Sequence, residues 1–149
     1  MRLRLSLIDS DANNTTPAEQ THVRTKIVAL VVDDNEIIRA LLRDMLECLA
    51  VKVLEAGTAE HALEALSAQQ VDVVVCDYSM PKVSGLELLK QIRSCAPRVR
   101  RVLYSGYSES HLDPLALGEA QPELILEKGT SMRHLANVLG ALLDDVRRS

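Results

Sequence analysis

The sequence predicts an α/β fold in which a doubly wound, five-stranded parallel sheet carries helices on both faces. Two observations lead to this prediction. Short apolar segments alternate with amphipathic segments of helical period along most of the 149 residues. Residues 27–32 (IVALVV) and 71–76 (VDVVVC) are also almost continuously apolar, which is typical of central parallel strands that are covered on both faces.

The first half of the pattern begins with the strand at residues 27–32, followed by three N-cap residue types at residues 33–35. The helix that they open has an apolar stripe of Ile38, Leu41, Leu42, Met45, Leu46 and Leu49. A short strand at residues 51–54 and a helix that opens at Gly57 and Thr58 come next. The strand at residues 71–76 then ends at Asp77.

In the second half, Ser84 and Glu87 have the spacing of a capping box, and strands are predicted at residues 99–104 and 124–126. Between these strands, Asp113 followed by Pro114 suits the start of a short helix, and a mostly irregular loop is the alternative. Thr130 or Ser131 caps a last helix, whose apolar stripe consists of Met132, Leu135, Leu139, Leu142 and Val146.

Composition narrows the class of protein. The net charge of −4 argues against nucleic acid as a direct partner, because binding to phosphates requires clustered Lys and Arg. The longest apolar runs are too short to span a bilayer, so no membrane partner is expected. Cys48, Cys76 and Cys95 have no metal or disulfide spacing, so we expect buried thiols in a reducing compartment and a cytoplasmic protein.

Domain organisation changes near residue 26. Residues 1–25 include a polar stretch with a proline, and we expect a flexible N-terminal extension there. Residues 26–149 hold the alternating pattern and are expected to form one domain. Because the chain has no Trp, no Phe and three Tyr, the core of this domain must be aliphatic.

Polar and charged side chains follow four of the predicted strands. Asp33 and Asp34 follow the first strand, Asp77 the third, Ser105 the fourth and Lys128 the fifth. Because ligands of such folds bind at the carboxyl ends of the strands, we expect these residues on one rim. Close carboxylates repel one another unless a cation neutralises them, and such oxygen ligands suit Mg²⁺. With a hydroxyl and an ammonium, the rim has the components of phosphoryl transfer onto a carboxylate.

Each rim residue also has an ordinary structural interpretation. Asp33 or Asp34 could cap the following helix, and Asp77 could simply end a strand. Taken singly, Ser105 fits turn chemistry and Lys128 fits a solvated loop. Their combination on one rim favours the functional interpretation.

Four segments carry a resemblance to the receiver domain of bacterial response regulators. They are VVDDN (31–35), CDYSMP (76–81) with Gly85, LYSG (103–106) and EK (127–128), and their order and spacing are similar to the family pattern over about residues 26–147. The resemblance implies a flavodoxin-like strand order of 2-1-3-4-5. The chain resembles the receivers of hybrid histidine kinases more than it resembles receivers of the free chemotaxis type.

The resemblance also implies a role for each rim residue. Asp77 is the implied phosphoacceptor, Ser105 the switch hydroxyl and Lys128 the cation that pairs with the phosphoryl oxygens. The implied ligands of a Mg²⁺ cofactor are Asp34, Asp77, the backbone carbonyl of Ser79 and, mainly through water, Asp33.

Three departures from the family pattern bear on these roles. Gly129 stands where the family usually has a proline in a cis peptide bond, so we expect a trans bond here. The orientation of the Lys128 side chain therefore stays open. Ile125 stands where the family often has an aromatic ring that moves with the switch hydroxyl. Prolines in the fourth crossover are expected to reshape the usual output face.

We therefore predict a stand-alone response regulator receiver, a signalling switch rather than an enzyme acting on an external substrate. Its expected partners are a histidine kinase or histidine phosphotransfer protein as phosphodonor and a downstream target protein, with homodimerisation left open. The alternatives are a pseudo-receiver that binds partners without a phosphorylation cycle, and an unrelated Mg²⁺-dependent phosphohydrolase. The second alternative is disfavoured because Ser79 stands where such an enzyme has a second acid/base carboxylate.

The three tyrosines of the chain gather near the predicted site. Tyr78 follows Asp77, and Tyr104 and Tyr107 bracket Ser105. We expect all three rings outside the core. We also hypothesise that Tyr107 partly covers a phosphoryl group on Asp77 and slows its hydrolysis.

Overall fold

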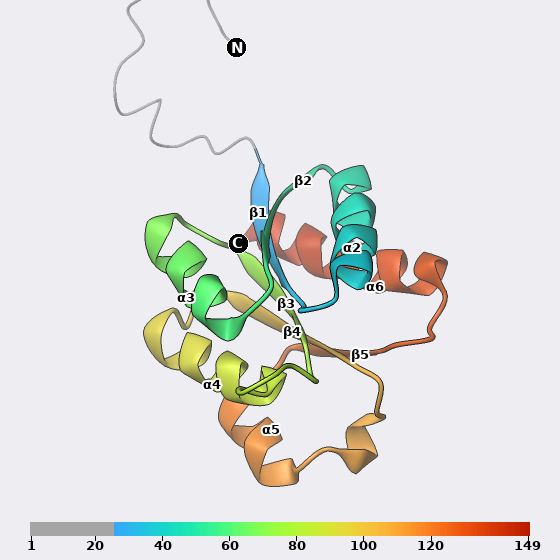
Figure 1. The fold of residues 1–149 in the computed structure, drawn as a ribbon. Helices are drawn as coiled ribbons and strands as arrows, with labels where there is room; N and C mark the ends of the chain where they lie inside the picture. Colours follow the sequence, from blue (N-terminus) through green and yellow to red (C-terminus); the bar gives the residue numbers. More distant parts are fainter. Residues whose placement is uncertain (1–25) are drawn as a thin grey trace, which may run out of the picture.

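The computed structural model describes residues 26–149, which form one five-stranded parallel sheet with helices on both faces (Figure 1). The strand order is β2-β1-β3-β4-β5, as the resemblance implied. The strands are β1 (Ile27–Val32), β2 (Val51–Ala56), β3 (Val73–Asp77), β4 (Arg100–Ser105) and β5 (Leu124–Glu127). The predicted N-terminal extension lies outside the described residues.

The helices cover the sheet in two layers. On one face, α2 (Glu36–Cys48) and α6 (Met132–Arg148) pack against residues such as Val31, Val75 and Val102. On the other face, α3 (Ala59–Ala68), α4 (Gly85–Cys95) and α5 (Pro114–Ala120) pack against the alternate strand residues. Every residue of β1 and β3 is buried, which explains why these two strands read as continuous apolar runs.

The helix starts follow the predicted capping chemistry. Of the three candidate caps for α2, Asn35 is the one used, and its side chain accepts hydrogen bonds from two backbone N–H groups of the first turn. Ser84 caps α4 and Ser131 caps α6, and Asp113 caps α5 ahead of Pro114. Because Asn35 caps α2, helix capping does not account for the two aspartates that precede it.

Several predicted core positions are wrong. Tyr104 is 8% exposed and packs with the α2 and α6 layer, because β4 alternates its side chains between the two faces of the sheet. Cys48 and Cys95 are exposed at the last residues of their helices, and only Cys76 is buried among the cysteines.

Two predicted helix stripes are also too wide. Leu41 in α2 and Met132 in α6 are exposed. The fully covered stripe of α6 is Leu135, Leu139 and Leu143, with a spacing of four residues. A helix lying on a sheet buries a narrow stripe, so the flanking apolar positions remain partly open to solvent.

A buried arginine holds the short helix α5 in place. Arg101 lies in β4 with 8% of its surface exposed. Its guanidinium donates to the backbone carbonyls of Val99, Ala120 and Gln121 at 3.0–3.2 Å. Burial lowers the pKa of this guanidinium. These bonds satisfy carbonyl groups at the end of α5, where Gln121 leaves the helix in the left-handed conformation.

Within residues 26–149, no helix combines the length and apolar character that crossing a membrane requires.

Candidate functional site

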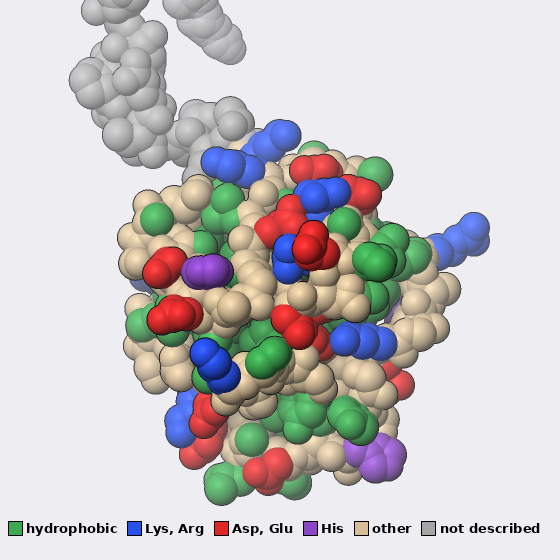
Figure 2. All heavy atoms as spheres, viewed as in Figure 1, with side chains coloured by type: hydrophobic (Ala, Val, Ile, Leu, Met, Phe, Trp, Pro, Cys, Tyr) green, Lys and Arg blue, Asp and Glu red, His purple; other side chains and the backbone are tan. Residues whose placement is uncertain are grey.

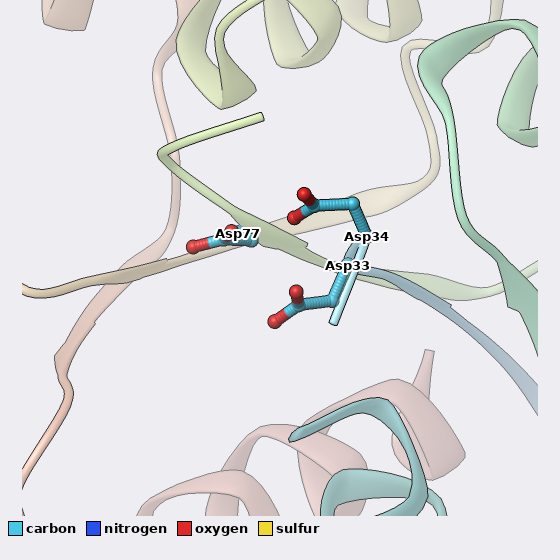
Figure 3. A group of neighbouring side chains, drawn as sticks. All are labelled: Asp33, Asp34 and Asp77. Atoms are coloured by element: carbon cyan, nitrogen blue, oxygen red, sulfur yellow. The ribbon is translucent and has the colours of Figure 1, made fainter. Parts of the chain in front are cut away.

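The structure brings the predicted acidic residues together at the carboxyl edge of the sheet. Asp33 directly follows β1, and Asp77 is the last residue of the neighbouring strand β3. One carboxylate oxygen from each of Asp33, Asp34 and Asp77 lies within 4.8 Å of the others (Figure 3). The strand order reverses between β1 and β3, which is where doubly wound folds bind ligands.

Two of the three aspartates in the acidic cluster are buried and the third is exposed. Asp33 and Asp77 are 1% and 4% exposed, whereas Asp34 is exposed. Figure 2 shows acidic side chains reaching the surface near the middle of one face, with a basic side chain beside them. The cluster is therefore accessible to a ligand through its Asp34 side.

Asp33 carries an uncompensated oxygen atom. Its Oδ1 accepts a hydrogen bond from the backbone N–H of Asn35 at 2.8 Å, but Oδ2 is buried and has no hydrogen-bond partner within residues 26–149. Burial raises the pKa of Asp33, and the Asp77 and Asp34 carboxylates add to the rise. The Asn35 hydrogen bond and the Lys128 ammonium oppose it.

Lys128 supplies the positive charge of the site. Its Nζ lies 2.7 Å from Asp77 Oδ1 in an ion pair, and that carboxylate oxygen has no well-aligned hydrogen bond. The ammonium also lies 5.5 Å from the centre of the Tyr104 ring, within range of a cation–π interaction. Burial by itself would lower the pKa of Lys128, but the Asp77 and Asp33 carboxylates outweigh it and raise the pKa.

The loop at Gly129 does not misdirect Lys128. The described residues contain no cis peptide bond, so the expected trans bond after Lys128 is confirmed. Gly129 has a φ of 94°, a conformation that glycine adopts readily and that the ring of a proline excludes. The backbone N–H of Lys128 donates to the carbonyl of Ser105 at 2.7 Å, which ties this loop to the end of β4.

Ser105 is fully buried at the end of β4. Its Oγ accepts a hydrogen bond from the backbone N–H of Tyr107 at 2.9 Å, so the hydroxyl proton is available to donate to another group. Ser79 is exposed in the loop after Asp77, and its role as a carbonyl ligand stays a prediction.

Two residues outside the predicted site position the acidic cluster. Arg39 Nη1 donates to the backbone carbonyl of Asp33 at 2.6 Å, while its Nε pairs with Glu55 at 3.0 Å. Arg39 lies outside the apolar stripe predicted for its helix, and the sequence gives no signal for this contact. A Cβ atom on Gly85 would overlap the carbonyl of Asp77 and come within 2.9 Å of Tyr78 Cα, so only glycine fits there.

The residues present fit a hard divalent cation. In the described part of the chain, three carboxylates gather beside the Lys128 ammonium, and a buried Asp33 oxygen lacks a hydrogen-bond partner. A cluster made of carboxylate oxygens and open to water on one side suits Mg²⁺ better than metals that prefer nitrogen or sulfur ligands.

The fold and the site define a class of α/β protein with an acidic, lysine-containing pocket at the switch point of its sheet. The family model described as the response regulator receiver domain matches residues 29–139, and the chain belongs to this family. The chain is 32% identical over 142 residues to the autoinducer 1 sensor kinase/phosphatase LuxN of Vibrio campbellii, covering 91% of this chain. It spans 16% of the length of that relative.

Solved structures are similar over most of the described chain. A signal receiver domain of an HD domain-containing protein from Pseudomonas fluorescens Pf-5 has a TM-score of 0.76 and 27% identity, over 83% of this chain and 99% of its own. The response regulator TrrA from Thermotoga maritima, solved in complex with Mg²⁺-BeF, has a TM-score of 0.70 and 28% identity, over 78% and 98% of the two chains.

Proposed function

We propose that this receiver domain accepts a phosphoryl group from a phosphohistidine onto Asp77. The observation that carries the proposal is the environment of Asp77, a buried carboxylate in contact with Lys128 and within 4.8 Å of two further carboxylates. The ion pair with Lys128 would suit a purely structural aspartate, but the two further carboxylates would not, because like charges at this distance destabilise the fold.

The proposed step is a transfer between two covalent bonds. An oxygen of Asp77 attacks the phosphorus atom, the P–N bond to the donor imidazole breaks, and the imidazole leaves with the electron pair. The product is an aspartyl phosphate. Lys128 offsets negative charge on the phosphoryl oxygens, and the Ser105 hydroxyl donates a hydrogen bond to one of them.

We assign the metal to the acidic cluster. Asp34, Asp77 and the Ser79 carbonyl bind Mg²⁺ directly, and Asp33 acts mainly through water. Bound there, Mg²⁺ supplies charge neutralisation and orients the phosphoryl group. The unpartnered oxygen of Asp33 and the Mg²⁺-BeF complex of TrrA support this assignment.

The proposed output is a change in protein–protein interactions in the cytoplasm. The donor is a histidine kinase or phosphotransfer protein, which agrees with the sensor kinase name of the relative LuxN. Residues 26–149 act as the receiver, with residues 1–25 as an extension. Action as a stand-alone receiver stays a prediction, which the size of the protein detected by antibody in its native cells would test.

Intact mass spectrometry tests the phosphorylation. Incubation of the full chain with Mg²⁺ and acetyl phosphate should produce one phosphoryl adduct that is labile to hydroxylamine and blocked by a chelator. Asp77→Asn should abolish the adduct. Asp44→Asn, a change of an exposed aspartate on α2, is the matched control and should keep it. A folded wild-type chain without an adduct would refute the proposal and favour the pseudo-receiver, while sustained turnover of a phosphoester would favour a hydrolase.

A further inference from the structure

An aromatic contact joins the two loops that flank the site. Tyr78 directly follows Asp77, and Tyr107 lies two residues after Ser105. The centres of their rings are 5.8 Å apart and the ring planes meet at 83°, the edge-to-face arrangement that aromatic pairs prefer. We call this pair the tyrosine latch.

The two halves of the latch differ in how firmly they are held. Tyr78 is fixed by its backbone, because its N–H donates to the Tyr104 carbonyl at 2.9 Å and its carbonyl accepts from the Gly85 N–H at 2.8 Å. Its ring also packs against the core on the α4 side of the sheet. Tyr107, in contrast, is 54% exposed. Tyr78 is therefore the anchor, and Tyr107 is the part that can leave.

Tyr107 is coupled to the switch hydroxyl through its own backbone. Its N–H donates to Ser105 Oγ at 2.9 Å, so a movement of this hydroxyl toward Asp77 changes the position or the partner of Tyr107. The other tyrosine near Ser105 cannot serve in the same way, because Tyr104 is buried in the core beneath Lys128. Ile125 likewise offers no ring in β5.

We propose that the tyrosine latch holds the segment after Ser105 in its unphosphorylated position, and that phosphorylation of Asp77 releases Tyr107 from Tyr78. The inference rests on the proposed phosphorylation of Asp77. In the latch Tyr107 is a positioning residue that acts through Ser105, a role separate from the hypothesis that its ring covers the phosphoryl group.

The latch has a thermodynamic consequence that can be measured. If a phosphoryl group favours the released state, removal of the latch favours binding of a phosphoryl mimic by the same factor, because the coupling is reciprocal. An aromatic pair of this geometry corresponds to about a two- to tenfold change in an equilibrium constant. The variants Tyr78→Leu and Tyr107→Ala should therefore bind beryllofluoride two to ten times more tightly in the presence of Mg²⁺.

Fluorine NMR of the full chain labelled with 3-fluorotyrosine gives a direct readout. The chain has three tyrosines, so three signals are expected, and single Tyr→Phe variants assign them. Addition of Mg²⁺ and beryllofluoride should shift the Tyr78 and Tyr107 signals together, with a smaller change at Tyr104. The same titration gives the affinity for the mimic.

The matched control is Tyr107→Phe, which keeps the ring and should keep the wild-type affinity. The double variant of Tyr78→Leu and Tyr107→Ala should bind the mimic no more tightly than the tighter single variant, because both remove one contact. Equal affinity in all variants, or weaker binding in both single variants, would overturn the latch. A wild-type chain that binds no beryllofluoride would instead count against the proposed function, so the two failures are distinguishable.

Discussion

The two ends of the sheet treat buried charge in opposite ways. At the amino end, the buried Arg101 guanidinium donates from all three of its nitrogen atoms to backbone carbonyls. At the carboxyl end, Asp33 has a buried oxygen without a hydrogen-bond partner within residues 26–149, and Asp77 pairs with the Lys128 ammonium while two other carboxylates lie nearby. A charge that only supports the fold is fully satisfied, whereas a charge kept for a ligand is left incomplete.

The largest expected effect comes from removing the Arg101 guanidinium at the amino end of the sheet. Arg101→Met removes the donors to the buried Val99 and Ala120 carbonyl groups and should lower the free energy of unfolding by about 3 kcal/mol. Its neighbour Arg100 makes partly exposed ion pairs with Glu123 and Asp145, so Arg100→Met should cost less than about 1 kcal/mol. Urea unfolding of both variants tests the difference, and equal losses would contradict the role assigned to Arg101.

A second change disturbs the acidic end through its backbone. Gly85→Ala places a Cβ against the Asp77 carbonyl and should destabilise the protein by about 2 kcal/mol and displace the site. Gly118→Ala is the control, because a Cβ there meets nothing and alanine favours the α5 helix. Thermal unfolding should give a lower melting temperature for Gly85→Ala than for Gly118→Ala. A Gly85→Ala variant as stable as wild type would show that the loop after Asp77 can shift to accommodate the Cβ atom.

Removal of one negative charge from the site should raise the free energy of unfolding, whereas the two changes above lower it. Asp33→Asn relieves repulsion and should stabilise the metal-free protein by about 1 kcal/mol at neutral pH. The variant should also lose most of the increase in melting temperature that Mg²⁺ produces in wild type. Calorimetry with and without Mg²⁺ measures both effects, and a less stable metal-free variant would argue that Asp33 serves the fold.

The difference in stability between the wild type and Asp33→Asn should depend on pH. Because the folded pKa of Asp33 is raised, the wild-type protein gains stability as pH falls through that pKa toward the ordinary carboxylate range near about pH 4. The stability advantage of Asp33→Asn should therefore narrow over this range in metal-free buffer. An advantage that stays constant between neutral pH and about pH 4 would contradict the raised pKa.

A further change of about the size expected for Asp33→Asn concerns the loop that carries Lys128. Gly129→Ala forces a left-handed conformation on alanine and should cost about 1 kcal/mol, without a steric clash. The control Gly106→Ala lies in the neighbouring loop, where a Cβ also meets nothing and φ is not positive, and should be nearly neutral. Chemical unfolding of both variants is the measurement, and equal stability would exclude strain at Gly129.

Much of the fold and of the candidate site could be predicted because the evidence for it is local. Each strand is predicted by its own apolar run, and each helix start is predicted by its own N-cap residue, as at Ser84 and Asp113. The gathering of Asp33, Asp77, Ser105 and Lys128 follows from topology alone, since parallel strands end at the same edge of a sheet. What failed was the depth of burial, as for Tyr104, because local periodicity does not say how far a neighbouring layer extends.

The sequence by itself thus determined the order of elements and the chemical groups on the rim. Only the tertiary structure decided which oxygen of Asp33 lacks a partner, that Arg101 binds the end of α5, and that the Tyr78 and Tyr107 rings meet. The reason is physical. These contacts join residues that are far apart along the chain or on different loops, and their distances depend on how the layers pack rather than on any residue's own preference.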